Sequence, residues 1–135
     1  MEKKQAHLEM IQNVINRLSR NSFLLKGWSV VLVSAMFSVA GYDTQLYFVL
    51  LAYFPAIAFW GLDGYFLRQE RLFRALYDHI RNSQEEEINY SMDRSEFQDQ
   101  VKPWWKVTLS LTLLVFHGTV FLTITIVTAV SYLYF

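Results

Sequence analysis

Two oppositely charged residues lie at the ends of long apolar runs, where they could form an ion pair. Lys26 lies near the start of the first run, and Asp63 directly follows the second. If the two runs form an antiparallel helical hairpin, both side chains reach the same end of it. A pair at that depth would fix the register of the hairpin or act as a latch, because losing one partner strands the other in a partly desolvated place. The alternative is that lipid headgroups hydrate each residue separately.

His117 is the one acidic or basic side chain inside the third apolar run. An ionisable group within a membrane helix is a functional candidate, and an imidazole changes charge near physiological pH. A proton pathway would need further carboxylates or histidines at that depth, and none is apparent from the sequence. Hydrogen bonding between helices is therefore the favoured role.

Nothing in the chain predicts an enzyme. Its three histidines lie in different surroundings, there is no cysteine, and no paired-histidine spacing occurs. Gly-x-Ser-x-Gly and Gly-x-x-x-x-Gly-Lys patterns are also missing. We therefore expect no catalytic residues, no metal and no cofactor. Twelve Lys and Arg balance twelve Asp and Glu, so the charge predicts no nucleic-acid partner either.

Four arginines follow the second apolar run at helical spacing: Arg68, Arg71, Arg74 and Arg81. Their position beside the predicted membrane makes them candidate contacts for anionic lipid headgroups. Acidic residues of another subunit are a second possibility. A phosphate-bearing signal is the third, because arginine forks match phosphate geometry, although no Gly-rich loop accompanies them.

The elements that must position these residues are membrane helices. Of the 135 residues, 53% are hydrophobic and only 18% are charged. Residues 23–42, 46–62 and 107–135 each approach or exceed the ~20 residues that cross a bilayer, so the sequence predicts an all-α integral membrane protein with three transmembrane helices. Core helices of a soluble protein are the alternative. Pro55 should kink the second helix, and residues 43–45 should form the outer turn.

Charges and aromatic residues predict the same orientation. Five Lys and Arg occur up to Lys26, seven occur from Arg68 to Lys106, and none occurs elsewhere, which predicts a cytoplasmic N-terminus. The expected interfacial belts are formed at the cytoplasmic side by tryptophans and at the outer side by tyrosines: Trp28, Trp60, Trp104 and Trp105, and Tyr42, Tyr47, Tyr132 and Tyr134. We expect a multi-pass protein of the bacterial inner membrane.

The polar segments predict a cytoplasmic helical base. Residues 1–22 form an amphipathic helix with an apolar stripe that includes Ile11 and Ile15, and residues 63–106 continue the second span as a helix with its own stripe, followed by a loop. The two stripes are candidate partners. The first helix is expected to run into the first span, since no proline precedes the membrane, and Asn21, Ser22 or Gly27 are candidate positions for a bend. A helix lying on the membrane surface is the alternative for residues 1–22.

The third span carries two polar faces. One contains threonines, and the roughly opposite one contains His117; the candidate pore or packing residues are Thr112, His117, Thr119 and Thr123. A three-helix monomer can hide only one of these faces, which favours a homo-oligomer with this helix toward a central axis.

Two segments, residues 21–28 (NSFLLKGW) and 59–77 (FWGLDGYFLRQERLFRALY), resemble a group of small bacterial multi-span membrane proteins associated with antiphage defence. The resemblance implies a membrane effector that permeabilises or depolarises the inner membrane after a cytoplasmic sensor or signalling protein fires. It implies a shared juncture between membrane and base, formed by Lys26, Trp28, Trp60, Asp63, Arg68, Glu70 and Arg71. The expected partners are the lipid bilayer, further copies of the chain and that sensor. The alternative is a non-conducting membrane anchor or sensor subunit for a cytoplasmic partner.

Overall fold

The computed structural model describes residues 2–43 and 46–134, with side chains described for residues 2–39 and 49–134. The expected outer turn therefore lies partly outside the described residues, and the predicted positions of the Tyr42 and Tyr47 side chains lie outside them entirely. Within the described part every regular element is helical.

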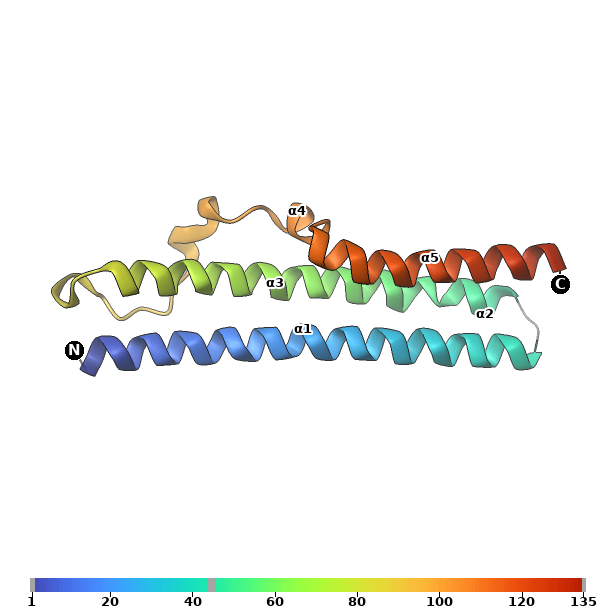
Figure 1. The fold of residues 1–135 in the computed structure, drawn as a ribbon, viewed down its shortest axis with the longest axis horizontal. Coiled ribbons are helices and arrows are strands. Elements are labelled where there is room, and N and C mark those ends of the chain that lie inside the picture. The colour runs from blue at the N-terminus through green and yellow to red at the C-terminus, as the bar shows by residue number, and fades with distance from the viewer. Residues whose placement is uncertain (1, 44–45, 135) are drawn as a thin grey trace.

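Long helices run side by side along one axis (Figure 1). Helix α1 (Glu2–Asp43) lies antiparallel to α3 (Tyr53–Asn82), which is preceded by the short α2 (Leu46–Leu51). A loop with two 3-10 turns, η1 (Glu85–Glu87) and η2 (Ser95–Gln100), leads to α4 (Trp104–Thr108) and α5 (Leu111–Tyr134). Helix α5 lies along the half of the hairpin that is remote from the N-terminus (Figure 1).

Three helical segments are long and apolar enough to cross a membrane: Glu2–Val39, Val49–Asn82 and Leu111–Tyr134. At 1.5 Å per residue, α1 alone is about 63 Å long, roughly twice the ~30 Å of a hydrocarbon layer. By length and composition, the all-helical fold with three candidate spans agrees with the prediction.

Helix α1 is continuous, so the N-terminal helix runs into the first span as predicted, and it is not broken at Asn21, Ser22 or Gly27. The reason is tertiary packing. Residues of α1 on both sides of these positions lie against α3: Ile15 belongs to one buried cluster with Leu72, and Val33 to another with Ala56. A straight helix keeps both contacts.

The second apolar run is broken near Pro55, as predicted. Proline has no backbone N–H, so the carbonyl four residues earlier, on Leu51, loses its helical partner. The backbone N–H of Ala52 donates to Val49 O at 3.1 Å, three residues earlier, which tightens the chain between α2 and α3. A second break, at residues 109–110, separates α4 from α5.

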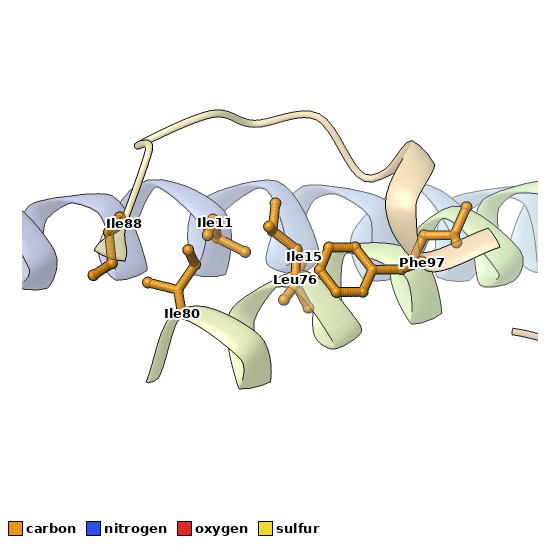
Figure 2. Packing of buried hydrophobic residues seen from close by; sticks show 7 residues of the cluster. Ile11, Ile15, Leu76, Ile80, Ile88 and Phe97 are labelled. Atoms are coloured by element: carbon orange, nitrogen blue, oxygen red, sulfur yellow. The ribbon is translucent and has the colours of Figure 1, made fainter. Parts of the chain in front are cut away.

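The two polar segments pack together, which confirms the predicted pairing of their apolar stripes. Ile11 and Ile15 of α1 form a buried cluster with Leu72, Leu76 and Ile80 of α3. Figure 2 shows that the loop adds Ile88 and Phe97 to the same cluster. Because α3 and the loop cover this stripe of α1, the stripe is not free to lie on a membrane surface. We call residues 2–22, 64–82 and 83–103 the base.

Polar contacts fasten the loop across the base. Lys4 Nζ donates to the carbonyls of Arg81 and Ser83 at 3.0 and 2.8 Å, and His7 Nε2 lies 3.0 Å from Ser91 O. Arg94 Nε donates to Gln69 Oε1 at 2.9 Å. These contacts tie the loop to both α1 and α3, so the three segments of the base form one packed unit.

Candidate functional site

A buried polar cluster joins all three long helices at the level where the base meets the apolar half of the molecule. Asp63 of α3 is fully buried, and its Oδ2 lies 2.6 Å from Lys26 Nζ of α1 and 2.8 Å from His117 Nε2 of α5. The Ser22 hydroxyl of α1 hydrogen bonds to Asp63 Oδ1. We call these four residues the Asp63 cluster.

Local structure explains how α1 presents two of these groups. Ser22 and Lys26 are four residues apart, so they lie on the same side of α1. Lys26 Nζ donates to Ser22 Oγ at 2.9 Å while it pairs with Asp63. Both side chains therefore converge on one carboxylate.

Helix α5 reaches the cluster through a set of contacts around Trp60 of α3. The Trp60 indole stacks on the His117 ring with centroids 5.9 Å apart and an interplanar angle of 10°. Trp60 Nε1 also donates to Thr108 O at 2.8 Å. That carbonyl belongs to the last residue of α4, where intrahelical partners are missing. The break between α4 and α5 thus gives Trp60 an acceptor, and the stacking holds His117 against Asp63.

The α3–α4 crossing is unusually close at Gly64. A Cβ added there would lie 3.0 Å from Thr108 Cβ and 3.1 Å from Thr108 Cα. Trp104 Nε1 adds a hydrogen bond to Gly61 O at 3.0 Å. The missing side chain at Gly64 therefore sets how near α4, and with it His117, comes to Asp63.

The cluster is suited to ion pairing and to proton transfer. The Asp63 carboxylate lies against three polar groups, the Lys26 ammonium, the Ser22 hydroxyl and His117 Nε2. His117 Nδ1 is also buried and has no hydrogen-bond partner in the described part of the chain. A proton can pass between Nε2 and Oδ2 over 2.8 Å. Residues 2–43 and 46–134 contain no group of three potential metal ligands.

The predicted pair between Lys26 and Asp63 is confirmed, whereas the predicted juncture is only partly assembled. Trp60 lies beside this pair through its stacking on His117, but Trp28 is 57% exposed. The other three juncture residues contact different groups: Arg68 Nε donates to Lys102 O at 3.1 Å, Glu70 pairs with Arg74 at 2.7 Å, and Arg71 lies on the partly exposed surface of α3.

The candidate pore or packing set divides between two faces of α5. His117 is 1% exposed and points into the bundle, while Thr112, Thr119 and Thr123 are exposed. This division agrees with the two opposite polar faces predicted from the sequence, because positions 112 and 117 lie about 140° apart around a helix.

Sequence reasoning missed the contact between His117 and Asp63, and with it the carboxylate at the depth of the histidine. Ser22 was missed as well, although its place one turn before Lys26 was a usable signal. For His117 the sequence gives no such signal, because the level of α5 along the hairpin depends on the loop and on the break at residues 109–110.

The four predicted arginines also differ from one another. Arg74 pairs with Glu70 through two nitrogens, at 2.7 and 3.2 Å, and Arg81 lies 3.6 Å from Asp78. Arg68 and Arg71 have no carboxylate partner among the described residues. Two arginines of the series, Arg74 and Arg81, therefore have a carboxylate partner within α3, and the other two do not.

No protein-family model matches this chain, and neither a curated protein nor a solved structure matches it significantly.

Proposed function

We propose that the protein is an oligomeric membrane effector whose Asp63 cluster is a latch that keeps the membrane sealed. In the closed state the cluster holds α1, α3 and α5 together at one level. Movement of the base would separate these groups and open a path for ions along α5. The membrane would then be permeabilised or depolarised.

The observation that carries this proposal is the burial of charge between three helices that could pack without it. Removing an ion pair from water costs several kcal/mol per ion before its attraction and hydrogen bonds are counted. Apolar side chains of similar volume are often neutral or more stabilising in such places. A buried charge cluster that connects every long helix is thus better suited to switching between two states than to simple cohesion.

The threonine face of α5 supports an oligomer with this helix toward the axis. Within one chain α5 turns His117 inward and leaves Thr112, Thr119 and Thr123 uncovered. Copies of the chain arranged around a central axis would cover this face, and its hydroxyls would be available to water when the assembly widens.

The cellular setting follows from the resemblance noted above and from the charge distribution. We propose the bacterial inner membrane, with the base, which holds ten of the twelve Lys and Arg, in the cytoplasm, and antiphage defence as the process. A cytoplasmic sensor or signalling protein would act on the base. We propose no catalytic role, because Asp63 and His117 are buried and the groups of the cluster contact one another.

The proposal is tested by ion leakage from liposomes that contain the purified protein, with the assembled mass recorded in parallel. Asp63→Asn removes the charge that holds Lys26 and should increase leakage above that of the unaltered protein. Adding Thr119→Leu to Asp63→Asn should reduce the leakage again. Leu114→Ile is the control for α5, because it changes an exposed side chain on another face without changing its polarity.

A non-conducting anchor or sensor subunit is the second candidate, and one observation favours it. The hydroxyls of Thr119 and Thr123 donate to the backbone carbonyls of Val115 and Thr119. Hydroxyls bonded in this way can face lipid without an unsatisfied donor, so the threonine face does not require water. Tight liposomes containing assembled Asp63→Asn protein would support the anchor and contradict the effector.

A further inference from the structure

A band of basic residues surrounds the base next to the Asp63 cluster. On α1 the band lies between two residues of known place. Ser22 bonds to Asp63, and Ile15 packs in the core of the base. On α3 the band lies between Asp63 and Leu72. The band contains Arg17, Arg20, Arg68, Arg71 and Lys102, and Lys106 follows on α4.

Negative charge is scarce in this band. Helix α1 has no acidic residue between Glu9 and Asp43. Of the two carboxylates on the adjoining part of α3, Asp63 is buried in its cluster and Glu70 is paired with Arg74. The loop beside the band carries Glu96 and Asp99 in η2, and in the described part of the chain neither forms an ion pair with a basic residue of the band. The two helices of the band therefore present positive charge that has no acidic partner.

One patch of the band has a defined geometry. Arg68 Nε donates to Lys102 O at 3.1 Å, which places the loop residue beside α3 and orients the guanidinium. Arg71 lies on the same side of α3, since residues three apart on a helix are neighbours. Arg68, Arg71 and Lys102 thus form a basic patch at the corner between α3 and α4.

Large aromatic side chains adjoin this patch on the side of the apolar helices. Trp104 and Trp105 are 49% and 56% exposed. Trp104 is anchored by its hydrogen bond to Gly61 O, and Lys106 Nζ lies 5.3 Å from the Trp105 ring centroid. Exposed tryptophans beside cationic side chains are typical of the level of lipid headgroups.

We infer that Arg68, Arg71 and Lys102 form a binding site for the phosphate of an anionic phospholipid, with Trp104 and Trp105 beside its glycerol and upper acyl chains. Guanidinium groups bind phosphate oxygens through paired N–H donors. The inference rests on the membrane insertion that underlies the proposed function. It divides the predicted arginine series: Arg68 and Arg71 bind lipid, whereas Arg74 and Arg81 serve intrahelical pairs.

Quenching of tryptophan fluorescence by lipids brominated on the acyl chains tests this site. The full chain is reconstituted in phosphatidylcholine vesicles that contain the same fraction of brominated phosphatidylglycerol or brominated phosphatidylcholine. Brominated phosphatidylglycerol should quench more strongly in the unaltered protein. Each basic residue near a membrane surface contributes about 1 kcal/mol, so Arg68→Gln with Arg71→Gln should reduce the relative association of phosphatidylglycerol by about fivefold per arginine.

The matched control is Arg74→Gln with Arg81→Gln, which removes the same charge and should leave the lipid preference unchanged. Equal loss in both double variants, or no preference in the unaltered protein, would overturn the assignment. Displacement of phosphatidylglycerol by added inorganic phosphate would also overturn it, because the site would then take a free phosphate. Flotation of the vesicles separates this result from failure of the proposed function, since a protein that does not float with them is not inserted.

Discussion

Replacing Asp63 with alanine should lower the free energy of unfolding by about 3–5 kcal/mol, the usual cost of removing one partner from a buried ion pair. The change leaves the Lys26 ammonium without its counter-charge and His117 without the acceptor for Nε2. The measurement is reversible unfolding in mixed micelles, followed by helical circular dichroism.

A double variant shows whether the effect comes from the pair. Lys26→Met removes the stranded charge, so Asp63→Ala combined with Lys26→Met should cost less than the sum of the two single changes. Additive losses would mean that Lys26 and Asp63 are energetically independent, and the latch would then lose its basis.

Replacing Gly64 with alanine should destabilise the fold by about 1–3 kcal/mol, as is usual for an added methyl group in a tightly packed place. Alanine normally stabilises a helix relative to glycine by roughly 0.5–1 kcal/mol, so the expected sign is the opposite of that from helix propensity. The cause is the added Cβ, which would overlap the Thr108 hydroxyl oxygen and approach the Cα and Cβ of the same residue to 3.1 and 3.0 Å. That hydroxyl donates to Trp104 O, so relief of the overlap requires Thr108 to rotate and lose this bond, or α4 to retreat from α3.

Gly27→Ala is the matched control, because a Cβ at Gly27 meets nothing within 4 Å. It should be neutral or stabilising in the same unfolding experiment. The retreat of α4 also lengthens the bond from Trp60 Nε1 to Thr108 O, so Gly64→Ala should shift the Trp60 fluorescence in a background where Trp28, Trp104 and Trp105 are phenylalanine. Equal stabilisation by both glycine replacements would show that α3 and α4 do not pack closely.

The helices themselves could be predicted from the sequence because their signals are local. Runs of apolar residues with few charges indicate the three candidate spans, and the 3.6-residue period indicates the stripes of the base. The pair between Lys26 and Asp63 could also be predicted, since two consecutive helices joined by a short turn must be antiparallel neighbours. These inferences need only the order of residues along one hairpin.

The rest depends on contacts between distant segments. The loop covers the base through Ile88 and Phe97, although its polar composition gave no reason to expect a place in the core. The level of α5 is set by the Gly64 crossing and by the break at residues 109–110, so the approach of His117 to Asp63 could not be derived from spacing. By contrast, the separation of His117 from the threonines could be predicted, because it depends only on positions along one helix.

Chemical accessibility of the threonine face tests the latch most directly, and the absence of cysteine from the chain makes the measurement clean. Thr119→Cys is placed in the unaltered protein and in Asp63→Asn, both in liposomes, with Leu114→Cys as the control on another face. The rate of reaction with a membrane-impermeant methanethiosulfonate is then compared. The latch predicts faster reaction at position 119 when Asp63 is replaced, with no change at position 114. Equal rates at position 119 in both backgrounds would contradict it, because breaking the cluster would then open no aqueous path along α5.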